Sequence, residues 1–126
     1  MGGGSGGSYS TSSSTLINNH QELAKEFPLD HQGKFGTYSN PNVQQVFSDN
    51  PEKTARYFFE KLGKGGNHRP LENGKGEQST FGGPRESSVV FRPTSSSDGS
   101  PTVSIVIKGP DGISYKIHFV NPKQEK

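Results

Sequence analysis

The chain has 126 residues, a formal net charge of +2 and a hydrophobic content of only 25%. This length suits one compact domain, and the low apolar content argues against a large, layered α/β enzyme. Cysteine is absent, which excludes disulfides, thiolate zinc sites and cysteine nucleophiles. No apolar run approaches the roughly 18 residues of a membrane span, so we expect no membrane anchoring.

Composition predicts a linker followed by one domain. Residues 1–14 are mostly glycine and serine, which is typical of a flexible linker or a remnant of cloning. Residues 15–126 are expected to form the domain, with helices within 15–64 and a sheet within 75–120. Residues 1–60 hold 4 basic and 6 acidic side chains, whereas residues 61–126 hold 10 and 6. The basic C-terminal half fits a polyanionic partner, although solvated lysines would give the same balance.

The first elements are expected to be short helices. An amphipathic pattern predicts a helix over Thr15–Phe27, with His20 on its polar, exposed side. Residues 29–39 contain glycine and aspartate and are expected to be loop. A second short helix is expected over Pro41–Phe47, behind Asn40 as its N-cap.

The clearest helical pattern follows Asn50. Asn50 can cap the helix, and Pro51 suits its first position because proline lacks the N–H that would be unpaired there. Gly63 is expected to end the helix in a left-handed conformation. The apolar side chains recur at i, i+3, i+4 and i+7, which places on one face Ala55, Phe58, Phe59 and Leu62.

The hydrophobic period changes from about 3.6 to 2 after Gly66. The strands expected from this alternation are Glu77–Phe81, Ser87–Thr94, Thr102–Lys108 and Ile113–Val120. Helices followed by sequential strands predict an α+β fold, with N-terminal helices packed on one face of a four-stranded antiparallel sheet.

The last two strands can be paired through their apolar residues. Directly opposed residues share a face, so we expect Ile105 to pair with Ile117 and Val103 with Phe119. The helices would then cover this apolar face. The other face would be open, and the side chains expected on it are those of Arg92, Thr94, Lys116 and His118.

The residue types on this open face suit cleavage of RNA without a metal or a cofactor. A base removes the proton of the 2′-OH, the oxygen attacks the phosphate, and an acid protonates the leaving 5′-oxygen. His118 can act as base or acid near neutral pH, Arg92 and Lys116 can stabilise phosphate charge, and Thr94 can position a phosphate oxygen. By residue type and spacing alone, an exposed histidine among solvated cations is the more common case.

Four segments of the sequence resemble a known class of proteins. They are YFFEKLGKGG, PLENGKG, FRPTSSSDGSPTV (Phe91–Val103) and KIHF (Lys116–Phe119). Over residues 49–120 the chain resembles the C-terminal toxin domains of bacterial polymorphic toxins, the tips of contact-dependent inhibition, Rhs and LXG effectors. Such domains are similar to ribonucleases of the barnase–EndoU–colicin–RelE fold group, in which helices pack on a four-stranded antiparallel sheet.

The resemblance implies a function, partners and further site residues. It implies a toxin ribonuclease, delivered by secretion or from the cell surface, that cleaves RNA, often tRNA, in the cytoplasm of the target cell. A cognate immunity protein would block it, and an acidic one would complement the basic face. The resemblance adds Ser96 and Asp98 as substrate-binding candidates, and the basic loops add Lys75, Arg85 and His68 as phosphate contacts.

Two other functions stay open. A Mg²⁺-dependent DNase would use carboxylates from separate turns, the candidates being Asp98, Asp111 and either Glu77 or Glu86. A non-catalytic module would use the basic sheet face only to bind nucleic acid or a protein. Loss of activity in EDTA would distinguish the DNase from a metal-independent ribonuclease. Binding of RNA without turnover would distinguish the non-catalytic module from either enzyme.

Overall fold

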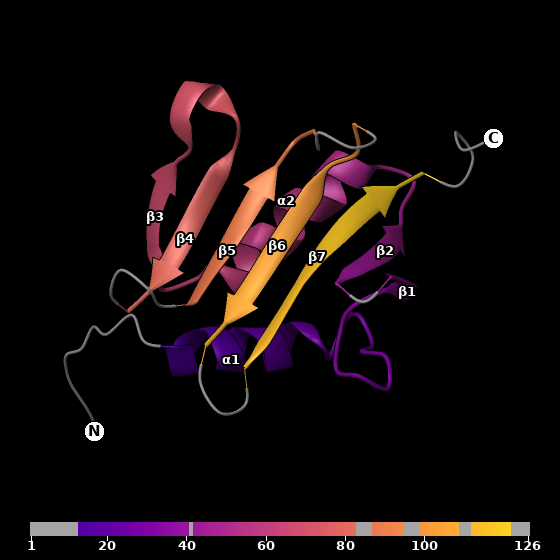
Figure 1. Ribbon diagram of the computed structural model, residues 1–126, viewed down its shortest axis with the longest axis horizontal. Coiled ribbons are helices and arrows are strands. Elements are labelled where there is room, and N and C mark those ends of the chain that lie inside the picture. The colour runs from indigo at the N-terminus through magenta and orange to yellow at the C-terminus, as the bar shows by residue number, and fades with distance from the viewer. Residues whose placement is uncertain (1–12, 41, 83–86, 95–98, 109–111, 122–126) are drawn as a thin grey trace.

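The computed structural model describes residues 13–40, 42–82, 87–94, 99–108 and 112–121. Within them seven strands form one sheet, with two α-helices and a short 3₁₀ helix (Figure 1). The elements in chain order are α1 (Ser13–Leu23), β1 (Thr37–Asn40), β2 (Val43–Phe47), α2 (Pro51–Leu62), β3 (Asn67–Pro70), η2 (Glu72–Gly74), β4 (Glu77–Phe81), β5 (Ser87–Arg92), β6 (Thr102–Ile107) and β7 (Ile113–Val120). The strand order is β1-β2-β7-β6-β5-β4-β3.

The predicted fold class is wrong. The sheet is mixed and has seven strands in the described residues, because β2 pairs in parallel with β7 and β1 and β3 extend the two ends. Residues 43–47, expected to be helical, form β2, and the expected loop over 29–39 contains most of β1. The sheet therefore begins well before residue 75.

Pairing with β7 explains why residues 43–47 are extended. The apolar residues of this segment, Val43, Val46 and Phe47, are spaced as on a helix, but a segment of five residues can also be a strand. Beside β7 the segment satisfies the backbone donors and acceptors that would be unpaired at the edge of the sheet. Gln44 then lies on the covered face and is fully buried.

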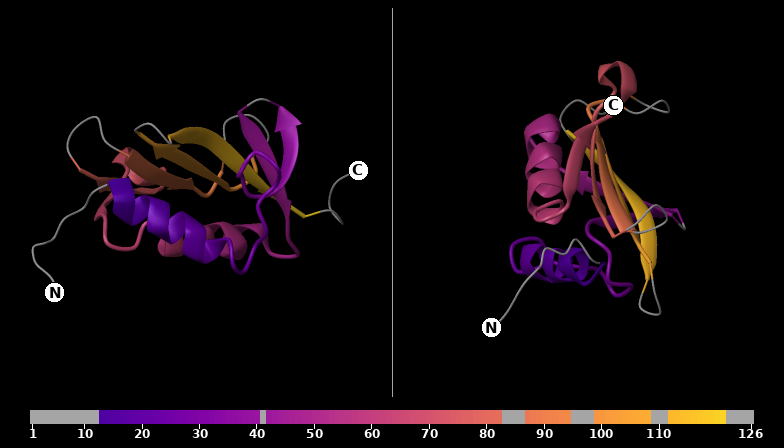
Figure 2. Two further views of the ribbon diagram at one scale, coloured as in Figure 1. Left: turned by 90° about the horizontal axis from the view of Figure 1, so that it is seen from below. Right: turned by 90° about the vertical axis from the view of Figure 1, so that its left-hand side faces the viewer.

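The two helices lie on the same face of the sheet, and the opposite face is open (Figure 2). Helix α2 has the predicted Asn50 N-cap, which accepts a hydrogen bond from Lys53 N, and Pro51 at its first position. Its four predicted apolar residues are buried. The ring centroid of Phe58 lies 5.0 Å from that of Phe119 on β7. No helix in the described part of the chain has the length and apolarity needed to span a bilayer.

The end of α2 differs from the expectation. Gly63 caps the helix, and its N–H donates to the carbonyl of Phe59, but its φ is −83° rather than left-handed. Glycine is favoured here by close packing, since an added Cβ would lie 2.9 Å from the Cβ of Ser79 on β4. The glycine thus lets the end of α2 pack directly against the sheet.

The four C-terminal strands form in the predicted places and are antiparallel, although β5 and β6 end sooner than expected. The register of β6 against β7 differs by two residues from the predicted one, because Ile117 pairs with Val103 and Tyr115 pairs with Ile105. A displacement of two residues preserves the alternation between faces. The covered face therefore remains apolar, and Lys116 and His118 remain on the open face.

Candidate functional site

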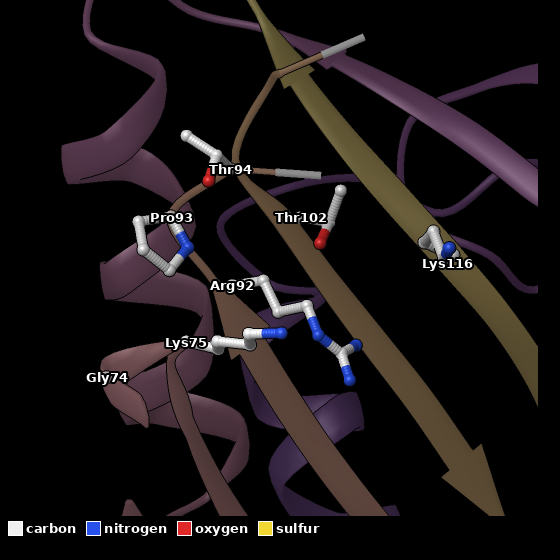
Figure 3. Close-up of a pocket in the computed structure, with 7 residues that line it drawn as sticks. All are labelled: Gly74, Lys75, Arg92, Pro93, Thr94, Thr102 and Lys116. Atoms are coloured by element: carbon white, nitrogen blue, oxygen red, sulfur yellow. The ribbon is translucent and has the colours of Figure 1, made fainter. Parts of the chain in front are cut away.

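A pocket of about 580 Å³ lies on the open face of the sheet, beside the end of β5 (Figure 3). We call it the cationic pocket. None of the described residues that line it is acidic, and three are basic. Its lining residues are Gly74, Lys75, Arg92, Pro93, Thr94, Thr102 and Lys116.

Lys75 reaches the pocket through a tight connection between β3 and β4. It directly follows η2, and its backbone N–H donates to the carbonyl of Glu72. The next residue, Gly76, has a φ of +140°, and an added Cβ would lie 2.0 Å from the carbonyl oxygen of Phe91. Only glycine therefore lets this connection lie so close to β5. In Figure 3 the side chains of Lys75 and Arg92 extend in the same direction, toward the strand that carries Lys116.

Strand register brings the other polar residues together. Arg92 on β5 pairs with Thr102 on β6, and Thr102 pairs in turn with His118 on β7. These three residues form one line across the open face. Lys116 lies two positions before His118 on β7 and pairs with Ser104, so its side chain shares the same face.

The pocket has an excess of positive charge. None of the three cations of the pocket forms an ion pair with a carboxylate of the described residues, where the ion pairs include Lys25–Glu22, Arg56–Glu77 and His68–Glu77. Three cationic side chains thus converge on a cavity whose described lining has no carboxylate. Such a cavity attracts anions, and guanidinium, ammonium and hydroxyl groups all donate hydrogen bonds to phosphate oxygens.

His118 lies beside the cationic pocket but does not line it. The residue is only 8% exposed, and its Nδ1 atom lies 2.8 Å from the hydroxyl oxygen of Ser100. Its cross-strand neighbour Thr102 does line the pocket. The predicted open face therefore carries this imidazole, but little of the residue is open to solvent.

The structure brings together four of the predicted site residues, Lys75, Arg92, Thr94 and Lys116. Three others, Arg85, Ser96 and Asp98, lie outside the described residues. Thr102 is a lining residue that the sequence analysis missed. The predicted register paired His118 with Ser104 and so did not place Thr102 beside the histidine. The observed register pairs His118 with Thr102, which puts Thr102 between His118 and Arg92.

His68 is not part of the cationic pocket. Its Nε2 atom lies 2.9 Å from Oε1 of Glu77. Its ring packs edge-on against that of Phe59, with 5.3 Å between the ring centroids. Since Phe59 is a core residue of α2, this contact places His68 on the helix-covered side of the sheet. It lines a separate pocket of about 260 Å³ at the end of α2.

The carboxylates considered for a Mg²⁺ site do not meet in the described residues. Glu77 is engaged by His68 and by Arg56, whose Nη1 atom lies 3.5 Å from Oε2. Asp98, Asp111 and Glu86 lie outside the described residues. Across the ranges that the structure covers, no group of three or more His, Asp or Glu side chains is placed to hold a metal ion.

Comparison of the chain with protein-family models, with curated proteins and with solved structures gave no match.

Proposed function

We propose that this chain is an endoribonuclease that cleaves RNA, in particular tRNA, without a metal ion, and that the cationic pocket holds the scissile phosphate. The observation that carries the proposal is the pocket itself. Lys75, Arg92 and Lys116 line one cavity together with two threonine residues, and none of these cations is paired with a described carboxylate. Arginine and lysine are the usual protein ligands of phosphate oxygens.

The pocket supports a chemistry in which the RNA supplies its own nucleophile. The 2′-oxygen attacks phosphorus as its proton passes to a base, and the bond to the 5′-oxygen breaks as an acid protonates that oxygen. The products are a 2′,3′-cyclic phosphate and a 5′-hydroxyl. The three cations would stabilise the charge that develops on the phosphorane, and the hydroxyls of Thr94 and Thr102 would hold its oxygens.

His118 is the predicted base or acid of this reaction. Ser100 orients its ring through the hydrogen bond to Nδ1, as a catalytic imidazole requires. Its neighbour Thr102 lines the pocket, so a ribose next to a bound phosphate would approach His118 at this boundary.

The test is incubation of the purified chain with total tRNA in EDTA at neutral pH. We expect fragments that end in a 2′,3′-cyclic phosphate. Arg92→Ala and Lys116→Ala should each lower the rate by roughly tenfold or more, and His118→Ala should abolish cleavage without changing the circular dichroism spectrum. The control is His31→Ala, which changes an exposed histidine outside the pocket and should keep the full rate. Intact tRNA with folded wild-type protein would overturn the proposal, and a fully active His118→Ala variant would remove His118 from the mechanism.

A non-catalytic nucleic-acid-binding module is the second candidate. The burial of His118 favours it, because a binding surface needs the cations of the pocket but no accessible imidazole. In that case the chain binds tRNA with an affinity that falls steeply as salt is added, and the RNA stays intact. The same incubation, followed by a binding measurement at two salt concentrations, separates the two functions.

The proposal includes a biological setting. As a polymorphic-toxin ribonuclease, the chain would be delivered by secretion or from the cell surface and would act in the cytoplasm of the target cell. A cognate immunity protein would protect the producing cell by covering the cationic pocket, and an acidic surface would complement it. Expression of the chain alone should stop growth, and Arg92→Ala should relieve the arrest.

A further inference from the structure

Phe47 is an exposed aromatic residue on the same face as the cationic pocket. In the described part of the chain, the large hydrophobic residues that are exposed are Tyr38, at 54%, and Phe47, at 49%. Phe47 ends β2 and pairs with Val120 of β7, which lies two positions after His118. Val120 shares the open face with His118, so the Phe47 ring lies on that face as well.

Gln45 extends the polar line of the open face onto β2. It pairs with His118, so Arg92, Thr102, His118 and Gln45 follow one another across β5, β6, β7 and β2. Neighbouring strands lie about 4.8 Å apart, which puts Gln45 roughly 10 Å from Thr102. Phe47 lies two residues further along β2 and on the same side as Gln45.

The spacing from the pocket to β2 suits a single strand of nucleic acid. A distance of roughly 10 Å or somewhat more is covered by two or three nucleotides, which lies within the footprint of known single-strand binding surfaces. Such surfaces combine cations that follow the backbone with aromatic rings on which bases stack. In a duplex the bases are already stacked on one another, so an isolated ring on a sheet gains nothing from them.

We propose that the open face binds a single RNA strand that runs from the cationic pocket across β7 to β2, where a nucleobase stacks on Phe47 and the amide of Gln45 contacts its edge. This inference rests on the proposed function, because it assumes that a phosphate of RNA occupies the pocket. It adds a base-binding subsite and a preference for unpaired nucleotides. Phosphate contacts position the strand, and the contacts on β2 supply the selectivity.

Tyr38 provides a matched control for the stacking role of Phe47. It is also an exposed aromatic residue, but it lies on β1 and pairs with Gln44, whose side chain is buried on the helix-covered side. The two aromatic residues are therefore on opposite faces of neighbouring strands. Loss of Tyr38 should affect solubility and stability as much as loss of Phe47 does, without removing a contact to RNA on the open face.

The experiment measures binding of two probes to the full chain and its variants, and of a double-stranded RNA to the wild-type chain. The first is a six-nucleotide 2′-O-methyl RNA, which cannot be cleaved because it lacks the free 2′-OH. The second is inorganic polyphosphate, which carries charge but no bases. Phe47→Ala should weaken binding of the oligonucleotide by roughly tenfold and leave that of polyphosphate unchanged. Phe47→Tyr should restore wild-type binding, Tyr38→Ala should match wild type with both probes, and Arg92→Ala should weaken both.

Each other result would overturn the inference. The inference fails if Phe47→Ala binds the oligonucleotide as tightly as wild type does. It also fails if Phe47→Ala loses the same affinity for polyphosphate as for the oligonucleotide, or if Tyr38→Ala loses as much affinity for the oligonucleotide as Phe47→Ala does. These results would leave the proposed function untouched, because its own test is the cleavage of tRNA and not the binding of a base on β2. If wild-type chain binds neither probe, the proposed function fails together with the inference. A double-stranded RNA bound as tightly as the single strand would also refute the base-binding subsite.

Discussion

A buried histidine makes the stability of this chain depend on pH. His20 of α1 is 6% exposed, and its Nε2 atom lies 2.8 Å from the hydroxyl oxygen of Tyr115 on β7. That oxygen also accepts the backbone N–H of Phe35 at 3.1 Å. With this N–H already donated to it, the hydroxyl is best satisfied when it donates its own hydrogen to His20, which requires a neutral imidazole. Burial accordingly lowers the pKa of His20 from 6.5 to about 4.

The direction of the effect follows from the lowered pKa. In the unfolded chain His20 binds a proton near pH 6.5, whereas in the folded chain it does so only near pH 4. The neutral imidazole therefore contributes its full stability above pH 6.5, and this contribution is lost as the pH falls toward 4. A tenfold difference in proton affinity corresponds to about 1.4 kcal/mol, so the free energy of unfolding should decrease by about 2.5 kcal/mol between pH 7.5 and pH 4.5.

Urea unfolding at pH 7.5, 6.5, 5.5 and 4.5 measures this dependence. Carboxylates also titrate in this range, so the informative quantity is the difference between wild type and His20→Gln, which keeps a polar side chain but cannot be protonated. The wild-type free energy of unfolding should fall by about 2.5 kcal/mol more than that of the variant. His31→Gln, at an exposed position, should follow wild type. Equal pH dependence in wild type and His20→Gln would show that the buried imidazole of His20 is not the group responsible.

Two further substitutions test the packing that builds the site and joins the helices. Gly76→Ala should destabilise the fold by roughly 3 kcal/mol or more, because its φ is +140° and the new Cβ would clash with the Phe91 carbonyl. Gly74→Ala, with open space around it, should cost only about 1 kcal/mol in urea unfolding. Asn19→Ala should cost about 1–2 kcal/mol, because its side-chain amide donates to two carbonyls at the end of α2. Asn18→Ala, at an exposed neighbouring position, is its control, and an equal loss in thermal unfolding would contradict the assigned role.

Local patterns in the sequence were sufficient for several elements. The helix over residues 51–62 carries its own cap, its proline and a complete apolar face, so its existence needs no knowledge of the rest of the chain. The strands of the C-terminal half follow from strict alternation. The same alternation placed Arg92, Lys116 and His118 on one face, because a side chain's face depends only on its parity along the strand.

The strand register and the burial of individual side chains could not be predicted from these local patterns. Both the predicted and the observed pairing of β6 with β7 oppose apolar residues, so hydrophobicity alone does not choose between them. The observed pairing places Ile113 opposite Ile107, whereas the predicted pairing would place Tyr115 there. His20 was expected on the exposed side of its helix, but the Tyr115 hydroxyl lies within hydrogen-bond distance and the sheet covers the ring. The pairing partner and the cover come from residues far away in the chain.

Local sequence patterns are sufficient for the elements whose stabilising contacts are local: the capped helix, the alternating strands, and the side chains that share a face. Contacts between distant segments are needed to make residues 43–47 a parallel strand beside β7 and to bring Lys75 next to Arg92 through the glycine beside β5. The same holds for the burial of His118 and for its hydrogen bond with Ser100. The physical reason is that backbone pairing and close packing depend on which distant segments meet, and hydrophobic periodicity carries no information about that choice.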